Sequence, residues 1–249
     1  MNLTSTAHHR VRRGLRPCRV RPLLPWQVLG RTLMNDGSEM TLARRGDEHS
    51  IRLGGNLLMT SRSHGSEEKL AEFGCAGLGT QPRARVLVGG LGMGFTARAA
   101  IAALRPDAVV DVVELVGAVV RWNRELIGHL ADAPLLDPRV RVIEGDVANV
   151  IARARDRYDA ILLDVDNGPE AFTARENQHL YSRQGLRRAR EALRPGGVLA
   201  IWSAFESRAF TARLREAGLE TRLVRVPANR HSNGLHSLWL GRRGPSGSP

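Results

Sequence analysis

Residues 85–95 read Arg85-Val86-Leu87-Val88-Gly89-Gly90-Leu91-Gly92-Met93-Gly94-Phe95, and Val113-Glu114 comes later in the chain. The pattern predicts a buried strand, a glycine-rich turn, a helix and a second strand that ends in an acid. Gly90, Gly92 and Gly94 lack a Cβ and adopt positive φ readily, so the backbone there can approach a bound nucleoside closely. The motif alone also fits a tight turn without a ligand.

Glu114 strengthens the nucleoside interpretation. It follows Gly94 by twenty residues and ends the second predicted strand. A carboxylate at this place can accept hydrogen bonds from ribose hydroxyls.

From residue 83 onward, predicted strands alternate with predicted helices, which indicates a parallel sheet covered on both faces. We expect an α/β, Rossmann-like sheet of seven strands whose last two form an antiparallel hairpin. The expected strands are 85–88, 108–114, 140–144, 160–164, 198–203, 221–226 and 237–241, and the expected helices are 96–104, 118–130, 148–154, 184–193 and 210–217.

A small β-hairpin or meander domain is expected before this sheet, at residues 25–65. Short strand candidates at 28–33, 39–43 and 50–53 are separated by glycine-containing turns. Ser66, followed by two glutamates, is a candidate N-cap of the next helix. The expected organisation is therefore a basic, disordered tail (1–24), the β domain (25–65), the nucleoside-binding domain (66–243) and a disordered end (244–249).

The overall composition favours a cytoplasmic protein that does not enter a membrane. No apolar run approaches the roughly 20 residues that span a bilayer. The apolar segment near the start is too short, and too soon broken by proline, for a signal peptide. Cys18 and Cys75 have no metal-ligand spacing and give no disulfide framework, as in a reducing compartment.

The net charge of +12 suggests nucleic acid as a partner, but its distribution argues against this. Lys69 is the only lysine, so the positive charge is almost entirely arginine. Residues 1–24 carry six arginines and no acid, which places half of the excess in the tail. The few aromatic residues do not alternate with basic ones as in a base-stacking surface.

Gly145-Asp146 follows the strand predicted at 140–144. The carboxylate of Asp146 can accept a hydrogen bond from the exocyclic amine of an adenine, and Val147 can offer its backbone N–H. The alternative is that Asp146 caps the helix that begins near Val147. Both roles are compatible.

A cluster of acids follows the strand predicted at 160–164. Asp164, Asp166 and Glu170 would form a negative pocket suited to a cationic group. Carboxylates held close together raise the pKa of at least one of them, which helps that group take a proton from an amine. Tyr181 is a further candidate for the acceptor pocket, as is Trp202. The alternatives are a polar turn for the acids and core packing for the aromatic residues.

Together these residues resemble the spermidine/spermine synthase (aminopropyltransferase) family, a branch of the fold of class I SAM-dependent methyltransferases. The resemblance covers roughly residues 26–240. Motifs that carry it are the glycine turn at 90–95, the acid-containing strand end at 113–116, Asp137-Pro138-Arg139-Val140, Gly145-Asp146, and Tyr158-Asp159 with the acids from Asp164. The resemblance implies Glu114 as ribose ligand, Asp146 as adenine ligand and Asp164 as catalytic base.

The chain also departs from the family pattern. Met93 replaces the aspartate of the glycine turn, and Asn167-Gly168 replaces the second Asp and the Pro of the family's DSSDP. The family's DExxYHE signature is reduced to its last acid, Glu68. Hence the nucleoside half of the site is retained and the diamine half is rewritten, which makes putrescine doubtful as the acceptor.

The resemblance implies an enzyme that moves an aminopropyl group from decarboxylated S-adenosylmethionine to a small amine. A methyltransferase that uses S-adenosylmethionine is the alternative, with Arg98 as a candidate ligand for the donor carboxylate; a non-catalytic nucleoside-binding relative is another. His64, His231 and His236 are too scattered for a metal site, so no metal is expected. The resemblance also implies a homo-oligomer, a dimer or a tetramer, with a homodimer as the form we expect.

Overall fold

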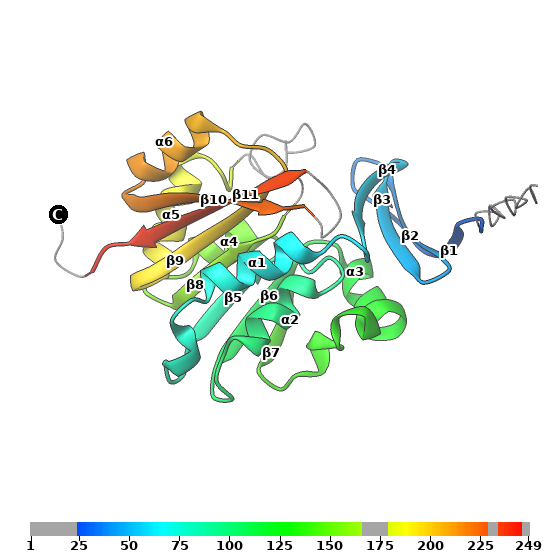
Figure 1. Cartoon of the computed structure of the whole chain (residues 1–249), viewed down its shortest axis with the longest axis horizontal. Coiled ribbons are helices and arrows are strands. Elements are labelled where there is room, and N and C mark those ends of the chain that lie inside the picture. Colours follow the sequence, from blue (N-terminus) through cyan, green and yellow to red (C-terminus); the bar gives the residue numbers. More distant parts are fainter. Residues whose placement is uncertain (1–23, 166–178, 229–233, 246–249) are drawn as a thin grey trace, which may run out of the picture.

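The computed structural model describes residues 24–165, 179–228 and 234–245, which form a small antiparallel sheet beside a larger α/β sheet (Figure 1). No helix in these ranges has both the length and the apolar composition needed to cross a membrane.

The small sheet contains four antiparallel strands in sequential order. Its strands are β1 (Gln27–Leu33), β2 (Glu39–Arg45), β3 (Glu48–Leu53) and β4 (Asn56–Thr60). The sequence predicts the first three and misses β4, whose Asn-Leu-Leu-Met-Thr segment has little β-branched character. The turn before β4 explains the strand, because Gly54 and Gly55 both have positive φ, as a two-residue hairpin loop of type I′ requires.

The large sheet has the strand order β10-β11-β9-β8-β5-β6-β7. Its strands are β5 (Arg85–Gly89), β6 (Val109–Glu114), β7 (Val140–Glu144), β8 (Tyr158–Leu163), β9 (Leu193–Ser203), β10 (Leu219–Pro227) and β11 (Leu235–Arg243). Neighbours from β7 to β9 are parallel, and β11 runs antiparallel to both β9 and β10. The predicted fold class, with a seven-stranded sheet closed by a hairpin, is confirmed.

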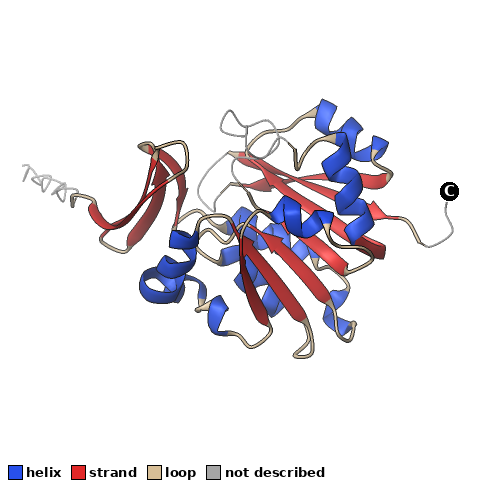
Figure 2. Ribbon diagram, turned by 180° about the vertical axis from the view of Figure 1, so that it is seen from behind, coloured by secondary structure: helices blue, strands red, loops and turns tan. Residues whose placement is uncertain are grey.

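Helices cover both faces of the sheet (Figures 1 and 2). They are α1 (Gly65–Gly74), α2 (Phe95–Ala102), α3 (Gly117–Trp122), α4 (Val147–Ala152), α5 (Arg183–Ala192) and α6 (Arg208–Glu216). Apolar residues of α1, α2 and α3 join one hydrophobic cluster, and those of α4, α5 and α6 join another. The alternation of strands and helices thus gives one core on each side of a buried sheet.

Two local predictions are wrong. The helix expected from Ser66 begins at Gly65, and the Ser66 hydroxyl donates to the Glu67 carboxylate instead of capping the helix. The helix expected over 118–130 ends at Trp122 and continues as a π-helical turn, Asn123–Ile127, and a 3₁₀ turn. Gly128 permits this change, because a Cβ there would lie 2.3 Å from the carbonyl oxygen of Asn123.

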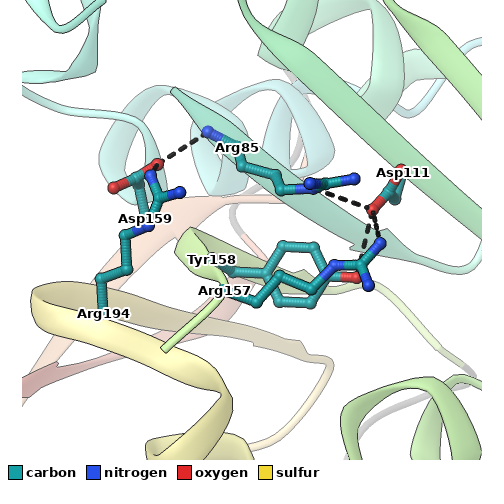
Figure 3. Close-up of polar contacts among 6 residues, drawn as sticks. All are labelled: Arg85, Asp111, Arg157, Tyr158, Asp159 and Arg194. Atoms are coloured by element: carbon teal, nitrogen blue, oxygen red, sulfur yellow. Dashed lines mark hydrogen bonds and ion pairs between the residues drawn. The ribbon is translucent and has the colours of Figure 1, made fainter. Parts of the chain in front are cut away.

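Asp111, on β6, is an almost fully buried acid that binds three partners near the amino ends of neighbouring strands (Figure 3). Its Oδ2 atom lies 3.4 Å from Nε of Arg85, 3.3 Å from a guanidinium nitrogen of Arg157 and 3.1 Å from the Tyr158 hydroxyl. Burial, followed by the charge of Asp111, raises the pKa of Tyr158 to about 12, so the phenol stays protonated and donates.

Asp159, which follows Tyr158 on β8, makes further hydrogen bonds at the same amino end of the strands. It accepts hydrogen bonds from the Gln81 amide (2.7 Å), the Arg85 backbone N–H (2.7 Å) and the Arg194 guanidinium (2.7 Å). Figure 3 shows Asp111 and Asp159 on either side of Arg85. These paired acids tie β5, β6, β8 and β9 together at the edge where the strands begin.

Candidate active site

A cavity of about 570 Å³ lies at the carboxyl ends of the parallel strands, between the large sheet and the small one. The strand order reverses beside β5, and this switch point is where open α/β sheets bind their ligands. The cavity is lined by the small sheet and its first turn, by the glycine turn, and by residues at or after the ends of β6, β7, β8 and β9. These include Met34, Met40, Met59, Gly90, Gly92, Glu114, Asp146, Val147, Asp164 and Trp202.

The glycine turn places bare backbone against this cavity. Gly90 has φ of 88°, and a Cβ there would lie 2.2 Å from the backbone carbonyl oxygen of Asp164. The carbonyl oxygen of Gly92 accepts a hydrogen bond from the Asn123 amide at 2.8 Å, which fixes the turn from the α3 side. Gly94 precedes α2, where a Cβ would lie 2.9 Å from Pro134, and it is not among the described residues that line the cavity; its contact with the nucleoside stays a prediction.

Glu114 lines the cavity at the end of β6. Its two carboxylate oxygens accept hydrogen bonds from the backbone N–H groups of Leu91 and Val116, both at 2.9 Å. These bonds anchor the glycine turn to the acid. Since a carboxylate oxygen can accept more than one hydrogen bond, this geometry is compatible with the ribose contacts predicted from the sequence.

Asp146 performs the capping role that the sequence left open. Its Oδ1 atom accepts the Ala148 N–H at 2.8 Å, and its Oδ2 atom lies 3.2 Å from Nε2 of His179. Both Asp146 and Val147 border the cavity. The adenine contact therefore stays a prediction.

Asp164 follows the last residue of β8 and faces the same cavity. The Thr96 hydroxyl, from α2, donates to its Oδ2 atom at 2.5 Å. Burial raises the pKa of Asp164 to about 6, and the Thr96 hydrogen bond opposes part of that rise. A carboxylate with this pKa is ionised at neutral pH and still basic enough to accept a proton from an amine.

Glu67, on α1, is a site residue that the sequence interpretation missed. Its side chain is buried and lines the cavity together with Asp164. Burial, followed by the negative charge of Asp164, raises the pKa of Glu67 to about 7. Helical periodicity could have identified it, because Glu67 is on the same face as the buried Leu70 and Ala71, three and four residues later.

Other predicted residues lie elsewhere or outside the described ranges. Tyr181 is buried in the hydrophobic cluster of α4, α5 and α6, with its ring edge-on to Phe210, and is not among the described residues that line the cavity. Arg98 pairs with Glu68 and Asp132 and is not in that lining either. Asp166, Glu170 and His231 lie outside the described residues.

The cavity is strongly acidic. Every charged side chain in its described lining is a carboxylate: Asp36, Glu67, Glu114, Asp146 and Asp164. Neither lysine, arginine nor histidine occurs in that lining, and among the described residues no three or more histidine, cysteine or acidic side chains are placed so that they could hold one metal ion. Such a field favours an organic cation over an anion.

The sheet order and the cavity at the switch point define a Rossmann-like α/β protein of the class I methyltransferase fold. Residues 66–212 match the family model described as the spermine/spermidine synthase domain. The chain belongs to this family.

Curated relatives match about half of the chain. Putrescine N-methyltransferase 2 of Nicotiana attenuata is 35% identical over 136 residues, which are 50% of this chain and 34% of that protein. Polyamine aminopropyltransferase 1 of Streptomyces coelicolor is 32% identical over 126 residues, 49% of this chain and 22% of that protein. The matched part therefore spans about a third or less of these relatives.

Solved structures agree with the fold over most of the chain. Spermidine synthase from Thermotoga maritima has a TM-score of 0.70 at 18% identity, covering 88% of this chain and 73% of that one. A spermidine synthase in complex with the transition state analogue AdoDATO has a TM-score of 0.69 with the same identity and coverage. At this identity the likeness concerns the fold alone.

Proposed function

We propose that this protein transfers an aminopropyl group from a decarboxylated S-adenosylmethionine-type donor to an amine. The observation that carries the proposal is the cavity whose described charged lining consists only of carboxylates. Decarboxylated donor has a sulfonium and an ammonium group but no carboxylate, so it gains most from this lining. Family membership and the aminopropyltransferase relatives support the same activity.

The donor's nucleoside would lie along the glycine turn. Gly90 and Gly92 offer close backbone contact, and Glu114 would accept hydrogen bonds from the ribose hydroxyls. Asp146 and Val147 would contact the adenine. Asp166 and Glu170 stay predicted ligands of the acceptor, and a cytoplasmic location and a homodimer likewise stay predictions from the sequence.

The transfer itself is a displacement at carbon. The amine's lone pair forms the new C–N bond while the C–S bond breaks and its electrons return to sulfur, leaving a neutral thioether. The protein's main contribution is to hold nitrogen and carbon in line, because orientation supplies much of the rate in such reactions. Asp164 would accept the proton that the amine nitrogen must lose.

Methyl transfer to an amine is the second candidate, and Met93 favours it. Residue 93 is a methionine, and its side chain is fully buried. The glycine turn therefore offers no carboxylate at this position for the ammonium group of an aminopropyl donor. The putrescine N-methyltransferases among the relatives support this alternative.

Calorimetric titration of the full chain with S-adenosylmethionine and with its decarboxylated form decides between the two. We expect the decarboxylated donor to bind more tightly and to support turnover with an amine. Tighter binding of the intact donor, with methylated amine as the product, would replace the proposal with the methyl alternative. Equal binding of both donors and no turnover with either would reject both transfer reactions.

A further inference from the structure

A hydrogen-bonded chain of three side chains runs from the cavity, through the first turn of α1, to β11. Ser66 is fully buried, and its hydroxyl donates to Oε2 of Glu67 at 2.7 Å. Nδ1 of His236, on β11, lies 2.9 Å from the same hydroxyl. Glu67 lines the cavity, whereas Ser66 and His236 stand behind it.

The single hydroxyl proton fixes the direction of this chain. While Ser66 donates to an ionised Glu67, it can only accept from His236, so His236 must carry its proton on Nδ1. Once Glu67 is protonated, the carboxyl can donate to Ser66, and Ser66 can then donate to an unprotonated Nδ1. Protonation of Glu67 therefore exchanges the favoured tautomer of a neutral histidine.

Trp202 is a second connection between His236 and the cavity, besides the one through Ser66 and Glu67. Its ring stands edge-on to His236, with ring centroids 4.7 Å apart, and its side chain borders the cavity on β9. An indole face attracts organic cations, which adds to the attraction of the two acids. Glu67, Asp164 and Trp202 thus all line the cavity, and each is a group that favours an ammonium ion.

Taking the proposed function as its basis, we propose that Glu67 is the second carboxylate of the acceptor site and binds the ammonium group of the amine beside Asp164. Ser66 and His236 are positioning residues that aim Glu67 and respond to its protonation. The acceptor class is a primary or secondary amine that enters as a cation. This assignment uses residues at which the chain departs from the family signature and needs no second acid after Asp164.

Two acids and one hydrogen-bonded hydroxyl surround the Glu67 carboxyl group. Asp164 and Glu68 are the acids that act on it, and Ser66 connects it to His236. Glu68 pairs with Arg98, so it competes little for a cation in the cavity. When one of the two acids is protonated and the other is ionised, the pair keeps one negative charge that attracts the ammonium ion and one carboxylate that can accept its proton.

Binding of 1,4-diaminobutane and of monobutylamine, measured by calorimetry with 5′-methylthioadenosine present, tests the assignment on the full chain. We expect Glu67→Gln to weaken amine binding by about 10- to 100-fold, the loss typical of a charged hydrogen bond, and to leave 5′-methylthioadenosine affinity unchanged. Glu72→Gln is the matched control, since Glu72 is exposed on the same helix and pairs with Lys69. Amine binding by Glu67→Gln equal to that of the control would overturn the proposal, as would a wild-type protein that binds neither amine.

¹⁵N spectra of the histidine rings test the positioning role separately. We expect neutral His236, identified by its loss in His236→Gln, to move from the Nδ1–H to the Nε2–H tautomer as Glu67 takes up a proton. Glu67→Gln should remove this pH dependence. If the His236 tautomer changes with pH in the same way in wild type and in Glu67→Gln, the positioning role of His236 is refuted.

Turnover separates this assignment from the proposed function. Glu67-dependent amine binding without transfer from either donor would refute the proposed function and keep the acceptor site. Group transfer at the wild-type rate in Glu67→Gln would refute the acceptor site and keep the proposed function.

Discussion

At the scale of single residues, Gly90 packs directly against Asp164, which joins the proposed donor side of the cavity to the proposed acceptor side. The backbone carbonyl of Asp164 occupies the space that a side chain at residue 90 would need. Hence the position of the proposed base depends on the absence of one methyl group in the glycine turn.

Gly90→Ala should therefore destabilise the fold strongly. Left-handed backbone at φ of 88° and a Cβ contact of 2.2 Å together cost about 3 kcal/mol or more. Gly37→Ala is the control, because Gly37 has φ of 81° with open space around it, and only the backbone cost of about 1–2 kcal/mol applies. Urea denaturation measures both, and equal losses would refute the contact with Asp164.

Asp164→Asn should leave donor binding within twofold of wild type and lower turnover by roughly 10²–10⁴, the range for a lost general base. In wild type, kcat/KM should rise with pH through the region near 6, because Asp164 must be ionised to accept a proton. Unchanged turnover in the variant would remove Asp164 from the mechanism.

Thr96→Val tests how the base is tuned. The Thr96 hydroxyl stabilises the ionised carboxylate, so its removal should raise the pKa of Asp164 and move the rise in kcat/KM to higher pH. A pH profile that stays in place, with thermal stability preserved, would contradict the hydrogen bond's role.

At the scale of elements, the large sheet was predictable and the acceptor side was not. Apolar runs bounded by glycine or acidic turns gave β5, β6 and β8, since a buried parallel strand has that composition. Glu67 was missed because the residues that define its role are distant in sequence: Asp164, whose charge acts on it, and His236, which reaches it only through Ser66. The π-helical turn after α3 likewise depends on Gly128 lying against the Asn123 carbonyl, which periodicity does not reveal.

Asp111→Ala should destabilise the protein by about 2–3 kcal/mol without changing donor affinity. Its carboxylate is buried with Arg85, Arg157 and Tyr158, and loss of hydrogen bonds to a buried charged group costs that much. Asp107→Ala removes an exposed pair with Arg105 and should cost less than about 1 kcal/mol. Calorimetric unfolding and donor titration check both predictions. Weaker donor binding by Asp111→Ala would contradict them and would show that the two ends of the sheet are coupled.

At the scale of the whole molecule, the two buried acids of the cavity, Glu67 and Asp164, lower the stability of the fold when they are ionised. The pKa values of Glu67 and Asp164 rise on folding from 4.5 and 3.8 to about 7 and about 6. Because the folded state holds these protons more tightly, the stability they contribute is fully present below about pH 4 and is lost as pH rises through 6–7.

Glu67→Gln should consequently be more stable than wild type at pH 8, by roughly 1–3 kcal/mol, and nearly equal to it at pH 4. Urea denaturation at both pH values measures the difference, with Glu72→Gln as the variant expected to match wild type at each. A gain of the same size at pH 4 and pH 8 would contradict the raised pKa.

Three methionines border the cavity on the side of the small sheet: Met40 on β2, Met59 on β4, and Met34 in the turn between β1 and β2. A thioether is the side chain most easily converted by peroxide into a polar sulfoxide, and such a change in this apolar wall would alter its shape and polarity. We therefore expect oxidation of these thioethers to alter the surface to which the sulfonium donor is proposed to bind. A bound nucleoside would shield that surface, and methionine sulfoxide reductases would restore it.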